Sequence, residues 1–365
     1  MNTRFFLATI ALAAGALMAK DYKGGELYTN ETWMYGKFEA RMQMAAGSGT
    51  VSSMFLYHND SYLGGNEPWV EIDIEILGKN PNSFQSNIIT GYGPGNGLPD
   101  RKVTSEEHHA ISPASNQSFH TYSMEWTPDY VAWILDGKVV RKTIKGQGDN
   151  NQVQDLTKKP QGLRFNLWSH EDAGWVGAWN DNILPVYQFI NWVKVYEYTP
   201  GQGDNGSDFE LKWTDNFDNL DRSRWNLGDW TFDGNRVDIT PSNIFVKDGM
   251  LVIALTKKDA AIPADLVVPQ DSENNPQSSN SNNPGMSSSS QSQYNTDQSS
   301  SSTNKNTDNR KNQKNNLDED DNDQTDAIRP AKVFRDSHKI RGTVNAKGAR
   351  VSETNKAHYQ VDFNY

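Results

Sequence analysis

The chain has 365 residues, no cysteine and a formal net charge of −11 at pH 7. The absence of cysteine excludes disulfides and thiolate metal sites, and the acidic balance argues against a nucleic-acid partner, which would need clustered Lys and Arg. All 11 tryptophans lie between Trp33 and Trp230, a density typical of a β-rich core or of aromatic stacking platforms.

The first 19 residues have the pattern of an export signal. Arg4 supplies a positive charge, and an apolar run from Phe5 to Leu17 ends at small residues near Ala19. The run is too short to span a bilayer comfortably, and no later segment approaches spanning length. We therefore expect a signal peptide at 1–19, no membrane span and a secreted, extracellular protein. A bacterial source fits best, because a cysteine-free exported chain suits bacteria better than the eukaryotic secretory pathway.

Residues 20–268 alternate short apolar segments with turns of Gly, Pro, Asn and Asp. In 35–44, apolar and polar residues alternate strictly, as in a half-buried strand. Two further strands, within 131–143, are joined by Asp136 and Gly137, the strongest short hairpin signal. Because no long helical period appears, the pattern predicts one all-β sandwich domain.

The remaining residues differ in kind. The segment 269–330 is rich in Ser, Asn and Asp and cannot bury enough apolar surface to offset its ordering entropy, so we expect a disordered linker. The segment 331–365, in contrast, is basic. Two interpretations of it stay open with equal weight: a small C-terminal module for attachment to the cell surface or for sorting, and a poorly ordered basic tail.

The strongest chemical signal is the segment 69–77. Its strict alternation predicts a β-strand with Glu71, Asp73 and Glu75 on one face and apolar residues on the other. The apolar face belongs to the core. Three neighbouring acids on the opposite face repel one another, so stability alone does not explain them.

The spacing of this triplet suits a retaining glycosidase. Residues four apart on a strand are separated by ~13 Å at the backbone, and two Glu side chains leaning together over a concave sheet would close this to roughly 5–6 Å, the carboxylate spacing of retaining enzymes. Glu71 would attack the anomeric carbon, while Glu75 would protonate the departing oxygen and later activate water. Asp73 would orient Glu71 and favour the protonated form of Glu75 by like-charge repulsion.

Two other interpretations stay open on the triplet alone, namely a solvated acidic strand face and a set of oxygen ligands for calcium. The neighbouring strands favour a sugar cleft, because the same alternation places amides, a guanidinium and aromatic rings on one surface. These residues are Phe55, Tyr57, Gln85, Asn87, Arg164, Asn166 and Trp168. Flat rings stack on pyranose faces, while amides and Arg bind hydroxyl groups.

At these residues the chain resembles the family-16 glycoside hydrolases, whose signature is the Glu-x-Asp-x-Glu strand found at 71–75. Within that family it is most similar to the (1,3-1,4)-β-glucanases, or lichenases, over about residues 24–257. The flanking segments that agree are 26–29, 35–41, 49–57 and 164–168. The resemblance implies a jelly-roll β-sandwich with a concave cleft that hydrolyses β-1,4 bonds of mixed-linkage β-glucan with retention and needs no cofactor for catalysis.

The resemblance also implies a circular permutation. The segment 208–255 is similar to one that precedes the catalytic strand in most members of the family, but here it follows that strand after a Gly-rich stretch at 199–207. Three further sugar-binding residues are implied: Trp175, Trp230 and Phe232. A structural calcium ion is implied at Asn191, Asn216 and the carbonyl oxygen of Gly249.

Alternative functions stay open at this point. A xyloglucan hydrolase or transglycosylase uses the same triplet spacing, and a laminarinase is another member of the family. A non-catalytic glucan-binding module with this fold is a different class, but such a lectin has no need of two close carboxylates. We expect β-glucan as the partner and a monomeric protein.

Overall fold

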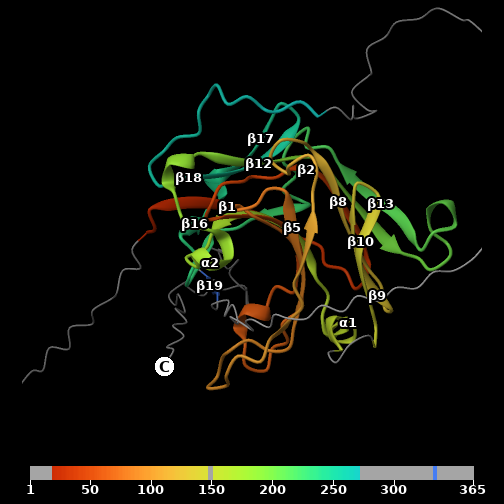
Figure 1. Ribbon diagram of the computed structural model, residues 1–365. Helices are drawn as coiled ribbons and strands as arrows, with labels where there is room; N and C mark the ends of the chain where they lie inside the picture. Colours follow the sequence, from red (N-terminus) through yellow and green to blue (C-terminus); the bar gives the residue numbers. More distant parts are fainter. Residues whose placement is uncertain (1–18, 147–150, 272–331, 335–365) are drawn as a thin grey trace, which may run out of the picture. The chain divides into compact units, whose positions relative to one another are not determined.

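The computed structural model describes residues 19–146 and 151–271, and the backbone of 332–334 (Figure 1). The predicted signal peptide lies outside the described residues except for Ala19. The predicted linker lies outside them beyond Asp271, and the predicted C-terminal segment lies outside them except for 332–334. No helix in the described part is long and apolar enough to cross a membrane.

The described residues form an all-β fold, as the sequence predicts. The first main sheet has the order β14 (Trp225–Leu227), β1 (Tyr22–Thr29), β11 (Gly162–Ser169), β3 (Thr50–Tyr57), β4 (Glu71–Leu77) and β5 (Ser83–Thr90), with β6 (Val103–Thr104) and β7 (Glu107–Ala110) paired to β5. The second has the order β10 (Lys138–Ile144), β9 (Tyr130–Leu135), β8 (His120–Trp126), β2 (Gly36–Gln43) and β12 (Val186–Tyr198), after which β12 pairs with β13 (Phe209–Asp215) and with β18 (Met250–Lys257), and β18 pairs with β17 (Ile244–Lys247).

Three short strands form a smaller sheet at the start of β1. It comprises β16 (Val237–Ile239), β15 (Trp230–Phe232) and β19 (Lys332–Phe334). In the described part of the chain, helical residues are confined to single turns, namely α1 (Gln152–Asp155), α2 (Ala173–Val176), η1 (Ser61–Leu63), η2 (Leu156–Lys158), η3 (Asp181–Ile183), η4 (Asp204–Gly206) and η5 (Pro241–Asn243).

The two main sheets face each other across one hydrophobic core. The apolar face of β4, with Ile72, Ile74 and Ile76, is completely buried in it, and burying each such side chain stabilises the fold by roughly 1.5–3 kcal/mol. Trp133 of β9 reaches the first main sheet, where its Nε1 donates a hydrogen bond to the carbonyl oxygen of Asp73 (2.9 Å). This bond links the second main sheet to the strand that carries the acidic triplet.

The predicted hairpin between β9 and β10 is confirmed. Asp136 and Gly137 have φ angles of 48° and 77°, and Leu135 lies opposite Lys138. Positive φ at both loop residues is what a two-residue type I′ turn requires, which explains the Asp-Gly pair.

The segment 208–257 is distributed over both main sheets. It supplies β14 beside β1 in the first, and β13 and β18 beside β12 in the second. In Figure 1, β16 and β18 of this segment lie next to the red strand β1. The pairing brings residues separated by about 200 positions of sequence into one framework.

The described residues continue past the predicted domain boundary at residue 268. The Asp271 carboxylate accepts hydrogen bonds from Nε and Nη2 of Arg41 (2.9 Å each) and from Nδ2 of Asn191 (2.9 Å). Its side chain is only 3% exposed. This ion pair ties the end of the described chain to β2 and β12.

Candidate active site

The register of the first main sheet aligns two rows of side chains across its strands, in which directly opposed Cβ atoms lie about 5 Å apart. One row is Asn87, Asp73, Phe55, Arg164 and Tyr28, and the other is Gln85, Glu75, Ser53, Asn166 and Glu26. The two rows bring together residues that the sequence places on five different strands.

The acidic triplet is buried. Glu71, Asp73 and Glu75 are 5%, 1% and 4% exposed, so the interpretation as a solvated acidic strand face is wrong. The sheet strands on both sides and the aromatic residues above exclude most of the water. The three carboxylates line a cleft with Ser53, Phe55, Trp69, Asn166, Trp168, His170 and Phe232.

The two glutamates have different hydrogen-bond partners. Trp69 Nε1 donates a short bond of 2.7 Å to Glu71 Oε2, which fixes that carboxylate from a position two residues before β4. Gln85 Nε2 donates a longer bond of 3.4 Å to Glu75 Oε2. The Gln85 amide is oriented in turn by Trp175, whose Nε1 donates to Gln85 Oε1 (3.2 Å).

A buried ion pair lies beside the cleft. Arg164 Nη1 is 2.5 Å from Glu26 Oε1, and both side chains are almost completely buried. Glu26 Oε2 also accepts a hydrogen bond from Asn166 Nδ2 (3.2 Å), and Arg164 Nη2 donates to Asn59 Oδ1 (2.8 Å). Glu26 therefore holds the guanidinium of Arg164 and the amide of Asn166 in fixed positions.

Aromatic rings form the wall of the cleft next to Glu75. The ring of Trp168 lies 5.1 Å from that of Phe232 and 5.9 Å from that of Trp175. Trp230 lies farther along, 5.9 Å from the Arg164 guanidinium. Phe232 of the late segment lines the same cleft as Glu71, whereas Trp230 does not belong to that lining.

The predicted sugar-binding residues fall into two groups. Those that line the cleft are Phe55, Asn166, Trp168 and Phe232. Those that lie behind or beside this lining are Tyr57, Gln85, Asn87, Arg164, Trp175 and Trp230. For example, Asn87 is fully buried, and its Oδ1 accepts a bond from the backbone N–H of Ser105 (2.9 Å).

Tyr57 is the clearest case of a residue behind the lining. Its ring packs edge-on against Phe55 and Trp69. Burial and the nearby charge of Glu71 raise the pKa of the Tyr57 hydroxyl well above its usual value. The hydroxyl thus stays protonated, and Tyr57 supports the aromatic floor next to Glu71.

Four residues of the site were not predicted: Glu26, Ser53, Trp69 and His170. Alternation would have identified three of them, because Ser53, Trp69 and His170 each lie two residues from a predicted site residue on the same strand or next to it. Glu26 gives no such signal. Its role depends on the register of β1 against β11, which the sequence of either strand does not specify.

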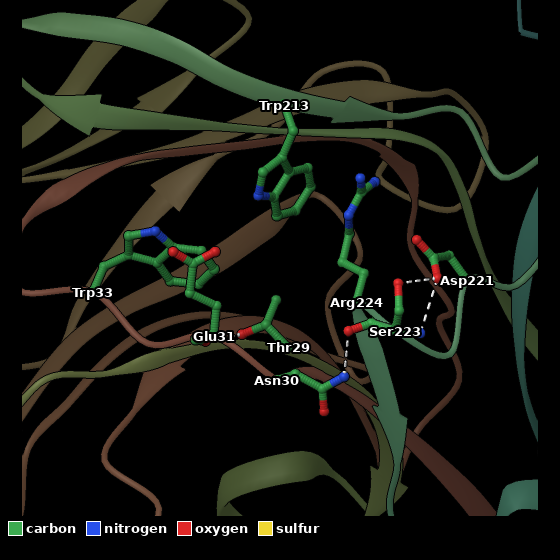
Figure 2. Close-up of a pocket in the computed structure, with 8 residues that line it drawn as sticks. All are labelled: Thr29, Asn30, Glu31, Trp33, Trp213, Asp221, Ser223 and Arg224. Carbon is green, nitrogen blue, oxygen red and sulfur yellow. Dashed lines mark hydrogen bonds between the residues drawn. The ribbon is translucent and has the colours of Figure 1, made fainter.

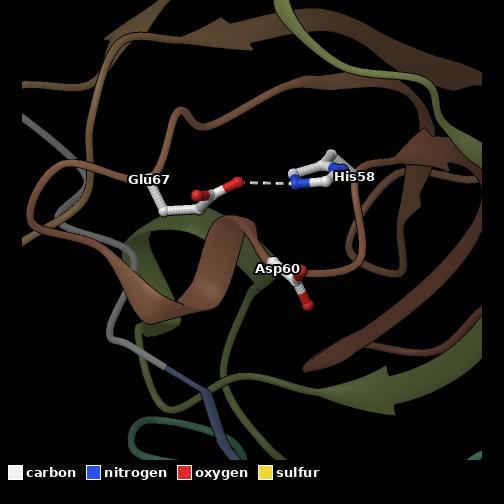
Figure 3. A group of neighbouring side chains, drawn as sticks. All are labelled: His58, Asp60 and Glu67. Atoms are coloured by element: carbon white, nitrogen blue, oxygen red, sulfur yellow. Dashed lines mark hydrogen bonds and ion pairs between the residues drawn. The ribbon is translucent and has the colours of Figure 1, made fainter.

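The rim loop between β3 and β4 contains a mixed group of titratable residues (Figure 3). His58 Nε2 lies 2.8 Å from Glu67 Oε1, and Lys159 Nζ lies 2.6 Å from the same oxygen. Burial alone would raise the pKa of Glu67, but the hydrogen bonds from Lys159 and His58 outweigh it and lower that pKa. Asp60 completes the one group of metal-ligating side chains that converges within the described ranges. Because Lys159 already neutralises Glu67, we interpret the group as an ionic tie between the rim loop and the segment before β11.

The residues implied for calcium lie on neighbouring segments. Asn191 belongs to β12, in which Val193 is opposite Asp215 and Ile190 is opposite Leu251. This register brings the end of β13, with Asn216, and the turn before β18, with Gly249, to either side of Asn191. The Asn191 amide nitrogen donates to Asp271 (2.9 Å), and the cluster of His, Asp and Glu side chains that converges among the described residues lies elsewhere, at His58, Asp60 and Glu67.

Comparison with known proteins identifies the family of the chain. Residues 8–194 match the family model described as glycosyl hydrolases family 16. A β-glucanase of Fibrobacter succinogenes is 60% identical over 273 residues, which are 74% of each chain, and a β-glucanase of Brevibacillus brevis is 34% identical over 54% of this chain and 68% of that one. A solved β-glucanase of Bacillus licheniformis is 30% identical with a TM-score of 0.36, over 46% of this chain and 68% of that one. Since the family model matches about half of the chain and the Fibrobacter relative is covered over more than two thirds of its length, this protein belongs to glycosyl hydrolases family 16.

Proposed function

We propose that the protein is an endo-β-glucanase that hydrolyses β-1,4 bonds of mixed-linkage (1,3-1,4)-β-glucan with retention of configuration. The observation that carries the proposal is the pair Glu71 and Glu75, both buried on one face of β4 and both lining a cleft. The names of the relatives support the substrate class, since both curated relatives described above are called β-glucanases.

The mechanism follows from two carboxyl groups that flank the scissile glycosidic bond, one facing the anomeric carbon and the other facing the departing oxygen. In the first step, a Glu71 carboxylate oxygen attacks the anomeric carbon while the Glu75 carboxylic acid gives its proton to the departing glycosidic oxygen. A glucosyl ester on Glu71 results. In the second step, Glu75, now a carboxylate, takes a proton from water as the water oxygen attacks the same carbon and releases Glu71. Two inversions restore the β configuration.

The surrounding residues orient these groups. Trp69 Nε1 fixes the attacking carboxylate, and the Trp175–Gln85 pair positions Glu75. Asp73 lies between the two glutamates on the strand, where its charge would favour the protonated form of Glu75 in the first step. Trp168 and Phe232 offer apolar faces to the sugar rings.

A substrate panel tests the proposal. Barley β-glucan, laminarin, cellulose and xyloglucan should be compared by reducing-end release and product analysis, with early products examined by NMR for anomeric configuration. We expect the fastest release from barley β-glucan, with β-anomers first. Faster release from laminarin or xyloglucan would instead support one of the alternative specificities, and early α-anomers would exclude retention.

We also propose a structural calcium ion at Asn191, Asn216 and the Gly249 carbonyl. A hard cation prefers such oxygen ligands, and a site of neutral oxygens would bind it weakly. Binding to the folded state alone raises stability by RT ln(1 + [L]/Kd), which is ~2.7 kcal/mol at 100 times Kd. The melting temperature should therefore rise with added Ca²⁺ and fall with a chelator. A melting temperature that is unchanged by added Ca²⁺ and by the chelator would contradict this calcium site.

The proposal extends to location. The charged, apolar and small-residue pattern of residues 1–19 supports export as a signal peptide, so the protein would act outside the cell as a monomer on its polysaccharide. Mass spectrometry of the protein recovered from culture medium should show a new N-terminus near residue 20. An intact N-terminus on cell-associated protein would contradict export with cleavage.

A further inference from the structure

A second cavity lies apart from the catalytic cleft, where β1 ends and the turn before β14 begins (Figure 2). Its volume is about 210 Å³. The residues that line it are Thr29, Asn30, Glu31, Trp33, Trp213, Asp221, Ser223 and Arg224. None of them lines the cleft that holds the acidic triplet.

Two indole rings form the apolar walls of this cavity. Trp213 of β13 and Trp33 lie with their ring centres 6.4 Å apart and their planes tilted by 53°. Trp33 is 7% exposed, and its Nε1 has no hydrogen-bond partner within the described part of the chain. A buried indole N–H without an acceptor is unfavourable, and a ligand oxygen would relieve it.

The polar groups of the cavity are held in place by their neighbours. Asn30 Nδ2 donates to the carbonyl oxygen of Ser223 (2.7 Å), and the Ser223 hydroxyl donates to Asp221 Oδ1 (2.6 Å). The Arg224 guanidinium lies 4.4 Å from the centre of the Trp213 ring and is paired with Asp215 (3.0 Å). Figure 2 shows Trp213, Trp33 with Glu31, and Arg224 approaching the same space from three sides.

This combination of groups limits the ligand. An anion would meet the carboxylates of Glu31 and Asp221, while an apolar molecule would remove water from those carboxylates and from Arg224 without offering them a hydrogen bond. A neutral polyol with C–H faces satisfies both requirements, because its ring packs on indole and its hydroxyl groups both donate and accept. The cavity is smaller than the 300–1,000 Å³ of sites that bury drug-sized ligands, so it suits one pyranose ring.

We propose that this cavity is a second, non-catalytic site that binds one glucosyl unit of β-glucan. The identity of the sugar rests on the proposed function, because the polymer held in the cleft is the polymer available to the cavity. A polysaccharide held at two places dissociates more slowly than one held at either place alone. The site would therefore keep the enzyme on its polymer between cleavage events.

The test uses the full chain with Glu71→Gln, so that glucan is bound without being hydrolysed. Mixed-linkage glucan oligosaccharides are titrated by calorimetry, and native gels containing barley β-glucan report retention. Two variants are compared on this background, Glu31→Ala and Glu197→Ala. Both glutamates pair with Lys212, but only Glu31 lines the cavity.

We expect two binding events in the parent. Glu31→Ala should weaken the second at least about tenfold, the effect of losing one charged hydrogen-bond partner, while Glu197→Ala keeps both. A second variant, Ser223→Phe, fills the cavity from an exposed turn position and should abolish the second event. Since Trp213 packs on the buried Trp225, its truncation is avoided.

Two results would overturn the inference: a single binding event in the parent, or equal weakening by the two glutamate variants, which would be a general charge effect. Failure of the proposed function looks different. If wild-type protein does not cleave β-glucan while the second event persists and depends on Glu31, the cavity site stands and the catalytic assignment falls. If wild-type protein cleaves β-glucan but the parent shows a single binding event, the catalytic assignment stands and the cavity site falls.

Discussion

At the residue scale, the positions of the residues beside the cleft depend on a buried ion pair between Glu26 and Arg164. Taking two charges out of water is costly, so each requires the other. Arg164 also lies 4.6 Å and 5.1 Å from the ring centres of Tyr28 and Tyr57. Its position therefore depends on Glu26, Asn59 and two aromatic rings together.

We expect Glu26→Gln to lower both stability and activity. The substitution keeps the size of the side chain but leaves the Arg164 charge buried without its partner, which costs on the order of 3 kcal/mol of unfolding free energy. The value of kcat/KM should fall at least about tenfold, because Arg164 and Asn166 lose a common acceptor. Urea denaturation and steady-state kinetics on barley β-glucan measure the two effects.

The matched control is Asp155→Asn, which breaks the partly exposed pair with Lys158 (2.9 Å). That change should cost less than about 1 kcal/mol and leave kinetics unaltered. Equal effects of the two substitutions would mean that the Glu26–Arg164 pair contributes no more than a surface pair.

At the element scale, the segment after β18 is held to β2 by the ion pair between Asp271 and Arg41. Chains ending after Asp271 and after Val268 should both retain the kcat of the full protein on soluble β-glucan, because the cleft is lined by residues from 53 to 232. Both chains lose the pairing of β19 with β15, which adds no residue to that lining. The shorter chain should be less stable by about 3 kcal/mol, since Arg41 loses the carboxylate that neutralises it in a buried position. Thermal melts of the two chains measure this difference.

Asp271→Asn in the longer chain is the control for that comparison, because it removes the charge and keeps the chain length. It should reproduce most of the loss. If the two truncated chains had the same melting temperature, the contact of Asp271 with Arg41 and Asn191 would not contribute to stability. A large fall in kcat on removal of the later residues would show that they reach the cleft.

Elements were predictable from sequence wherever one strand carries its own signal. The alternation of 69–77 predicted β4 and which residues lie on each of its faces, and the Asp136–Gly137 pair predicted the turn between β9 and β10. Partners across strands were not predictable in the same way. Glu26 and Asp271 act through residues 138 and 230 positions away in sequence, and such pairs depend on register and tertiary packing rather than on local pattern. For the same reason, the sequence did not reveal that Tyr57 and Asn87 lie behind the lining of the cleft.

At the scale of the whole molecule, the order of the strands along the chain is separable from their order in space. Tyr22 of β1 lies opposite Lys257 of β18, so the start of β1 and the end of β18 are neighbours. Tyr198 and Phe209 are likewise opposite each other across the link 199–207. A sandwich strand is stabilised by its lateral neighbours, so the contacts do not depend on which pair of ends is joined.

We therefore propose that the chain is a circular permutation of the usual family-16 order, and we expect the order to be reversible. In the rearranged chain, residues 208–257 come first and are joined by a short new linker to residue 24, and the original link 199–207 is cut. This chain should fold and hydrolyse β-glucan with a kcat within about tenfold of the parent. Circular dichroism and kinetics test this. A folded but inactive rearranged protein would contradict the common cleft of Phe232 and Glu71.

The central claim is that Glu71 attacks the sugar and Glu75 serves as acid and base, and azide rescue tests it most directly. Glu71→Ala and Glu75→Ala should each lose nearly all activity on a mixed-linkage glucoside with a good leaving group while remaining folded. Azide, a small anion, should restore turnover in both. With Glu71→Ala it fills the place of the nucleophile, attacks in a single inversion and gives the α-glycosyl azide. With Glu75→Ala it intercepts the ester on Glu71 and gives the β-glycosyl azide. Near-wild-type turnover of either variant without azide, or the reverse pairing of the two products, would contradict the assignment.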